Sequence, residues 1–351
     1  MRLQSPLRDE HLKLGAKLVD FGGWDMPLQY TGVLAEHAAV RQNVGLFDVS
    51  HLGKLIVEGT DATETLDRLL PGRVASLPVW KAGYNLVLNT GCGIVDDIFV
   101  YRHPDRWIVV PNASNSDAVK QVLGDHSGSG MTVTEGRERW AIIALSGPRA
   151  RDTLVPIIPM SQDLKMHRFG EFDFEGMPAM IARTGYTGQF TFEFFVSWEH
   201  APVVWQRLLQ LGATPAGLGA RDTLRLEMGY PLHGHEISED TNPIEAGLEW
   251  VIEWDKDFLL RDDLRALKET GIDRVLVGMV AHGQGIPRAH HRVFQDGLDV
   301  GEVVSGNFSP VLGHGIAMGY VTPKASMTGT MLSIDVRGKM LPVEVTKRPF
   351  V

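Results

Sequence analysis

Cysteine is almost absent from this sequence: Cys92 is the single one among 351 residues. One thiol excludes an internal disulfide and any zinc or iron–sulfur site built from several cysteines, and it is typical of a reducing compartment. Long apolar runs are also missing, since none approaches the roughly 20 residues that a bilayer span needs. The polar first fifteen residues lack the apolar core of a secretory signal. We therefore expect a cytoplasmic protein with no membrane association.

The sequence also lacks an excess of basic residues. The 34 Lys and Arg are outnumbered by 43 Asp and Glu, which gives a net charge of −9. Nucleic-acid binding calls for a clustered basic surface, so we expect no nucleic-acid partner. The 38 glycines and 19 prolines follow no period, and 44% of the residues are hydrophobic, as in an ordinary globular chain. The length predicts two to three domains.

Alternating and helical patterns predict both strands and helices. Residues 94–102 read as a strand that leaves a turn at 89–93, and residues 106–110 read as its hairpin partner. Leucines at helical spacing predict a helix over 62–70, with Asp61 and Glu64 as a box-like cap.

Further elements are expected in the second half of the chain. Residues 192–196 read as a strand, and a helix follows Gly217-Leu218-Gly219. The charged stretch 255–271 predicts a solvated helix. From Arg274 onward, short Val-rich runs separated by Gly-containing turns predict a small all-β lobe.

The adjacent acids Asp96 and Asp97 stand inside the predicted strand 94–102. Alternation places Asp96 on the face of Ile98, and Asp97 on the other face with Phe99 and Tyr101. At least one carboxylate should therefore meet an apolar environment, which is costly unless a polar group meets it. The pair is either a poised acid that stabilises a cation or a structural acceptor of hydrogen bonds.

Glu193 lies among three phenylalanines in Phe192-Glu193-Phe194-Phe195. It either faces solvent or is a buried acceptor. A carboxylate can accept two parallel N–H bonds, which suits the amidine-like edge of a pterin or guanine ring.

Arg221 and Arg225 share one face of the helix predicted after Gly219. A guanidinium near a helix start can bind an anion or the edge of a heterocycle. Arg225 can instead pair with Asp222 or Glu227 as plain structure. The Gly-x-Gly alone is a weak nucleotide signal.

The histidines give little support for a metal site. His233, His235 and the pair His290-His291 have no HExxH motif or cysteine-rich partner nearby, so we expect no metal. His51 follows Phe47-Asp48-Val49-Ser50 in what reads as a loop at a domain junction.

Six segments occur in the order typical of one enzyme family: 20–30 (DFGGWDMPLQY), 45–53 (GLFDVSHLG), 94–101 (IVDDIFVY), 183–188 (RTGYTG), 217–229 (GLGARDTLRLEMG) and 305–313 (SGNFSPVLG). On these segments the chain resembles, over essentially its whole length, the aminomethyltransferase family, the T-proteins of the glycine cleavage system. The resemblance implies transfer of a one-carbon unit from the aminomethyl-lipoyl arm of the H-protein to tetrahydrofolate, with release of ammonia. It implies tetrahydrofolate as co-substrate, lipoylated H-protein as partner, and no metal.

The resemblance also implies an α+β fold in a three-domain, ring-like (cloverleaf) arrangement. Two domains with antiparallel sheets would be discontinuous, one from 1–50 and 136–222 and the other, folate-binding, from 51–135 and 223–273. The third would be a β-barrel or jelly-roll-like domain over 274–351.

Residue roles follow from the same motifs. Asp97 matches the catalytic aspartate of the family, with Asp96 as a neighbouring acid. Glu193 matches the acceptor for the pterin, and Arg221 matches the arginine beside it. Lining residues of the folate slot are implied at Tyr84, Tyr101 and Asn112.

Three departures from the family pattern concern loops. Gln189 to Thr191 lack a Gly and an acid that usually precede the glutamate, Cys92 separates Gly91 from Gly93, and Leu260 stands where Gly is expected. They leave open a tetrahydrofolate-dependent demethylase with another donor. A non-catalytic folate-binding module is the other alternative, but its Lys-Gly-Cys-Tyr-x-Gly-Gln segment is missing.

Overall fold

The computed structural model describes residues 2–351, and the chain divides into two compact units. The first unit consists of residues up to 87 together with 97–221, and the second consists of 88–96 together with 222–351. No helix within the described part of the chain is both long enough and apolar enough to cross a membrane.

The largest sheet of the first unit has six strands in the order β11-β12-β13-β10-β4-β14. All pairs are antiparallel except β14 with β4. Helices α5 (Ala150–Leu154) and α6 (Ala201–Gln210) bury Leu154 and Trp205 in one core with this sheet. The strands are β4 (Gly45–Asp48), β10 (Trp140–Ser146), β11 (Phe169–Phe174), β12 (Met177–Ala182), β13 (Thr191–Ser197) and β14 (Thr214–Pro215).

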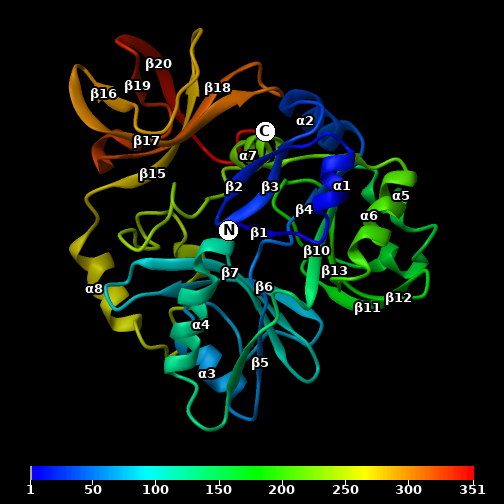
Figure 1. The fold of residues 1–351 in the computed structure, drawn as a ribbon. Coiled ribbons are helices and arrows are strands. Elements are labelled where there is room, and N and C mark those ends of the chain that lie inside the picture. The colour runs from blue at the N-terminus through cyan, green and yellow to red at the C-terminus, as the bar shows by residue number, and fades with distance from the viewer. Residues whose placement is uncertain (1) are drawn as a thin grey trace. The chain divides into compact units, whose positions relative to one another are not determined.

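A small sheet is formed near the N-terminus. Its order is β1-β3-β2, with β1 parallel to β3 and β2 antiparallel to it. The elements of this region are β1 (Leu3–Gln4), α1 (Arg8–Lys13), β2 (Lys17–Phe21), β3 (Trp24–Gln29) and α2 (Val33–Gln42) (Figure 1).

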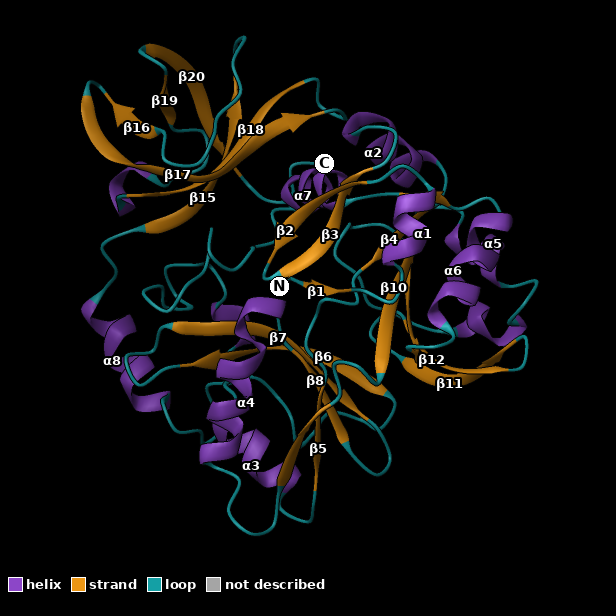
Figure 2. Cartoon of the chain, in the orientation of Figure 1, coloured by secondary structure: helices purple, strands orange, loops and turns teal. Residues whose placement is uncertain are grey.

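A five-stranded sheet of order β6-β7-β8-β5-β9 carries the predicted hairpin. Strand β7 spans Ile94–Arg102 as predicted, and its antiparallel partner β8 begins at Trp107, one residue later than expected. Helices α3 and α4 lie beside this sheet (Figure 2). The remaining elements are β5 (Leu55–Glu58), α3 (Ala62–Leu69), β6 (Lys81–Leu88), the 3₁₀ turns Ala113–Asn115 and Pro159–Asp163, α4 (Ser116–Asp125) and β9 (Thr132–Glu135).

The capping box predicted for α3 is wrong. The helix begins where expected, but the Asp61 side chain makes no cap hydrogen bond to it. Its Oδ1 instead accepts from the Thr60 hydroxyl, and its Oδ2 occupies the space that a Cβ on Gly130 would need.

The second unit contains a closed barrel of order β15-β18-β17-β16-β19-β20. Asp296-Gly297 and Arg337-Gly338 have positive φ at both residues, as tight hairpin turns require, so two predicted turns are confirmed. The barrel strands are β15 (Val275–Ala281), β16 (Arg292–Gln295), β17 (Leu298–Ser309), β18 (His314–Val321), β19 (Met331–Val336) and β20 (Lys339–Thr346), with a 3₁₀ turn at Pro323–Ala325.

Two predicted helices border or lie in the second unit. Helix α7 (Leu218–Glu227) starts in the first unit and ends in the second, where the sequence predicted a helix. Helix α8 spans only Arg261–Thr270, and 255–260 form turns, so the helix predicted over 255–271 is shorter than expected. A 3₁₀ turn covers Glu249–Val251. The predicted α+β class with a C-terminal β-barrel is confirmed.

Candidate functional site

The Asp97 carboxylate is held from both sides in the first unit. Tyr84 on β6 donates its hydroxyl to Asp97 Oδ2 at 3.1 Å. Asn112, just after β8, donates its amide to Asp97 Oδ1 at 2.8 Å. The predicted alternation along β7 is confirmed, because Asp97 is half-buried while Asp96 is fully buried. The structure thus gathers Asp97, Tyr84 and Asn112 and directs Asp96 to the other face of the strand.

Glu193 is neither in free contact with solvent nor sealed in the core. It is half-buried on β13 and accepts hydrogen bonds from the hydroxyls of Thr184 and, at 3.5 Å, Tyr101. Burial raises the pKa of Glu193, while the bond from Thr184 and the charge of Arg221 act to lower it. Of the two interpretations left open by the sequence, the structure supports the acceptor.

Tyr101 bonds Glu193 and stands on the same strand, β7, as Asp97. It lies on the same face of β7 as Asp97 and Phe99, four residues beyond the acid, so about 13 Å separates their positions on the strand. Aromatic rings continue along this face: Tyr84 to Phe99 at 5.7 Å and Phe99 to Tyr101 at 6.3 Å between centroids. Burial raises the pKa of Tyr101 well above its ordinary value, so its hydroxyl stays protonated and donates. This face of β7 therefore has Asp97 at one end, and at the other end Tyr101 with Glu193 beside it.

Arg221 lies in the first turn of α7, as predicted. Gly217 allows the chain to enter the helix, because a Cβ there would stand 2.4 Å from the Leu28 carbonyl oxygen. The Arg221 guanidinium lies over the Tyr186 ring, 4.7 Å from its centroid. It is half-buried, and its positive charge acts on Glu193.

Arg225, four residues later, has a structural role. Its side chain is 1% exposed and bonds Asp222 at 2.9 Å, Glu236 at 2.9 Å and the Ser305 hydroxyl at 2.8 Å. The predicted pairing with Asp222 is confirmed. The Glu227 carboxylate accepts from the Ser309 hydroxyl at 2.6 Å.

Thr184 and Tyr186 contact Glu193 and Arg221, and the sequence alone did not predict these contacts. Both residues lie inside the segment 183–188. A hydroxyl two residues before a tyrosine, in a Gly-rich loop next to the Glu193 strand, is the signal that could have found them.

The histidines are placed in separate contacts. Across residues 2–351, no group of three or more His, Cys, Asp or Glu side chains could hold a metal ion. His233 and His235 face backbone oxygens of Ile94 and Val304, His290 pairs with Glu302, and His291 accepts from the Arg288 amide.

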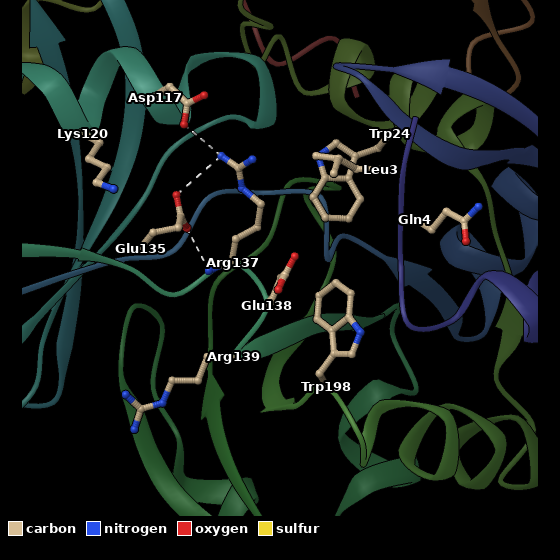
Figure 3. A pocket seen from close by; sticks show the side chains of 10 residues that line it. All are labelled: Leu3, Gln4, Trp24, Asp117, Lys120, Glu135, Arg137, Glu138, Arg139 and Trp198. Carbon is tan, nitrogen blue, oxygen red and sulfur yellow. Dashed lines mark hydrogen bonds and ion pairs between the residues drawn. The ribbon is translucent and has the colours of Figure 1, made fainter. Parts of the chain in front are cut away.

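A cavity of about 420 Å³ lies elsewhere in the first unit. Figure 3 shows Arg137 reaching toward Asp117 and Glu135, which it meets at 3.4 and 3.5 Å. Arg137 is thus already paired with two carboxylates, and none of the site residues predicted from the sequence lines this cavity. The lining residues are Leu3, Gln4, Trp24, Asp117, Lys120, Glu135, Arg137, Glu138, Arg139 and Trp198.

Comparison with known proteins gives one consistent answer. Residues 7–256 match the family model GCVT N-terminal domain, and residues 274–351 match the model Glycine cleavage T-protein C-terminal barrel domain. The chain is 41% identical over 355 residues to an aminomethyltransferase of Halothermothrix orenii, covering 99% of both chains. It is 42% identical over 356 residues to one of Mycobacterium avium, covering 99% of this chain and 97% of that protein.

A solved structure extends the likeness to three dimensions. The glycine cleavage system aminomethyltransferase T from Bartonella henselae matches with a TM-score of 0.94 and 34% identity, over 100% of this chain and 98% of that one. Sequence and fold agree along the whole length. The chain therefore belongs to the glycine cleavage T-protein family, the folate-dependent aminomethyltransferases.

Proposed function

We propose that this chain moves the one-carbon unit of an aminomethyl group, carried on the lipoyl arm of the H-protein, to tetrahydrofolate. The carbon loses its bonds to sulfur and to the amine and gains bonds to N5 and N10. The two folate N–H protons leave with the lipoyl thiol and with ammonia, and the products are 5,10-methylenetetrahydrofolate and dihydrolipoyl H-protein. The observation that carries the proposal is the face of β7 with Asp97 at one end and Tyr101, bonded to Glu193, at the other.

Asp97 is the proposed catalytic residue. Its carboxylate would orient the attacking folate amine and stabilise the positive charge that develops as ammonia leaves. Tyr84 and Asn112 fix both carboxylate oxygens, so the acid is oriented before the reactants arrive. No covalent intermediate on the protein is needed.

Glu193 and Arg221 are the proposed holders of the pterin. A half-buried carboxylate with raised pKa gains most from two N–H donors, and the pterin edge supplies such a pair. Tyr101 holds the same carboxylate. Asp96 is proposed as a supporting acid behind β7, since it is buried on the opposite face.

We also propose the domain division expected from the sequence. The six-stranded sheet draws its strands from Gly45–Asp48 and from 140–215, which supports a domain of 1–50 with 136–222. Strands β5 to β9 fall within 55–135, which supports the 51–135 part of the second proposed domain; its other proposed part is 223–273. The barrel strands fall within 274–351.

The test is turnover with aminomethylated, lipoylated H-protein as donor. We expect ammonia and 5,10-methylenetetrahydrofolate in equal amounts, and neither product when tetrahydrofolate is omitted. Tight folate binding without ammonia release would contradict the proposed donor. It would favour a demethylase acting on an O-, S- or N-methyl compound.

A further inference from the structure

His51 is a buried side chain whose polar atoms have no partner. It is 1% exposed, and neither ring nitrogen accepts or donates a hydrogen bond within residues 2–351. Its ring forms a T-shaped contact with the Phe21 ring, with centroids 5.3 Å apart and planes at 86°. A neutral imidazole carries one N–H donor and one acceptor, and buried groups of this kind are nearly always satisfied. Two unpaired nitrogens on one ring therefore call for an external polar group.

The turn that carries His51 is fixed by its neighbours. The Ser50 amide donates to Asp48 Oδ1 at 2.9 Å, and the Ser50 hydroxyl accepts from the Ile142 amide at 3.1 Å. Lys54 Nζ donates to the Ser50 carbonyl at 2.6 Å. The turn is thus fixed by bonds that do not involve the imidazole nitrogens, and both nitrogens are buried without a partner in the described part of the chain.

Burial, more than any neighbouring charge, keeps the His51 ring neutral. Burial lowers its pKa to about 3, and the charge of Arg221 is the next strongest influence in the same direction. Asp48 acts to raise the pKa of His51, and Lys54 acts to lower it. At neutral pH the ring therefore cannot give a proton as an acid, but it can donate one hydrogen bond and accept another.

We propose that His51 is a ligand-contacting residue of the folate site, bonding the pterin edge next to Arg221. The proposal rests on the proposed function, in which Arg221 and Glu193 hold the pterin. A pterin ring alternates N–H donors with nitrogen and oxygen acceptors along its edge, and so matches an imidazole with one of each. An ordered water is the competing occupant.

The experiment compares His51→Leu and His51→Gln in the full chain by calorimetric binding. The probes are 5-formyltetrahydrofolate and 6-methyltetrahydropterin, which lacks the aminobenzoyl-glutamate tail. His51→Leu should raise Kd about 5- to 100-fold for both probes, and His51→Gln should recover part of the loss. The ligand-free melting temperature of the Leu variant should not fall, because the change removes unpaired buried nitrogens. Kd should not change in the matched control His126→Leu, since that residue is exposed on the end of α4.

An unchanged Kd in a folded Leu variant would overturn the proposal and assign water to the ring. A loss seen with the full folate and not with the pterin fragment would overturn it too. If the Leu variant does not fold, ¹⁵N spectra of the histidine rings in the unsubstituted chain decide: the His51 nitrogens must shift when 5-formyltetrahydrofolate is added. The variant Glu193→Gln distinguishes a failure of the His51 proposal from a failure of the proposed pterin site. If it weakens binding while His51→Leu does not, only the role of His51 fails; if neither does, the pterin assignment itself fails.

Discussion

Arg221 and Arg225 lie one turn apart on α7, yet their surroundings differ. Arg225 is fully buried and is bonded to two carboxylates and a hydroxyl of the second unit. Arg221 is half-buried over the Tyr186 ring, and its charge acts on Glu193. The first arrangement is complete within the protein. The second has an exposed fraction and a nearby carboxylate of raised pKa, and it gains from a ligand.

The two surroundings distinguish a polar group that stabilises the fold from one that binds a ligand. A buried guanidinium with fixed partners stabilises only as long as every partner remains. A guanidinium stacked on a ring beside a desolvated carboxylate is less favourable for folding, because the carboxylate lacks donors that a bound heterocycle can supply. Removing Arg225 should therefore lower stability most, whereas removing Arg221 should mainly weaken ligand binding.

Arg225→Met should give the largest change in stability. It leaves Glu236 buried without its cation, so the free energy of unfolding should fall by about 3–5 kcal/mol. Arg221→Met should change it by less than about 1 kcal/mol while weakening folate binding. Urea denaturation of both variants measures this, and equal losses at the two positions would remove the distinction.

Asp97→Asn should give the next largest effect, and it should fall on chemistry alone. The amide keeps the shape of the side chain but loses its charge, so turnover should fall about 10²–10³-fold while the Kd for tetrahydrofolate stays within about twofold. Steady-state assays with titrated folate measure both, with exposed Asp117→Asn as the control. Unchanged turnover would remove Asp97 from the catalytic role.

Lys54→Met should stabilise the protein and flatten its pH dependence. Burial lowers the pKa of Lys54 to about 7, although the charges of Asp48 and Glu135 oppose this. Between pH 7 and the ordinary lysine pKa the unfolded chain binds more protons than the folded chain, so stability rises with pH in that window. The variant should gain roughly 1–4 kcal/mol at pH 7 and lose that slope. Denaturation at pH 7, 8 and 9 checks both, and a slope unchanged from the parent would contradict the assignment.

Glu193→Gln should weaken folate binding by about 1–3 kcal/mol without lowering stability at neutral pH. The pKa of Glu193 is raised in the folded chain, so its ionisation reduces stability as pH rises through that raised pKa. The amide cannot ionise and should lack this loss. Binding and melting curves at pH 5 and pH 7 test the pair of effects, and a less stable variant with unchanged Kd would reverse the interpretation.

The sequence predicted the parts of the fold that depend on local pattern. Alternation located β7 and its hairpin partner, and Gly-containing turns located the barrel. It failed at Asp61, whose carboxylate does not cap its helix but bonds Thr60 and lies against Gly130, which is distant in the sequence. The length of α8 was overestimated because charge alone does not mark where a helix begins.

The candidate site shows the same division. Asp97 and Glu193 stand out as acids in apolar strands, and each indeed meets hydrogen-bond donors. Tyr84 and Asn112 could not be found by spacing, since their contact with Asp97 spans 13 and 15 residues through sheet pairing; only family resemblance named them. Of the partners of Arg225, the sequence predicted only Asp222, because Glu236 and Ser305 are 11 and 80 residues away.

A crystal structure with bound 5-formyltetrahydrofolate tests the central claim most directly. We expect pterin N–H groups about 2.7–3.2 Å from the Glu193 carboxylate. We also expect Arg221 at the same ring and the reduced folate nitrogens turned toward Asp97. A pterin bound elsewhere, with Glu193 still bonded only to Thr184 and Tyr101, would contradict it.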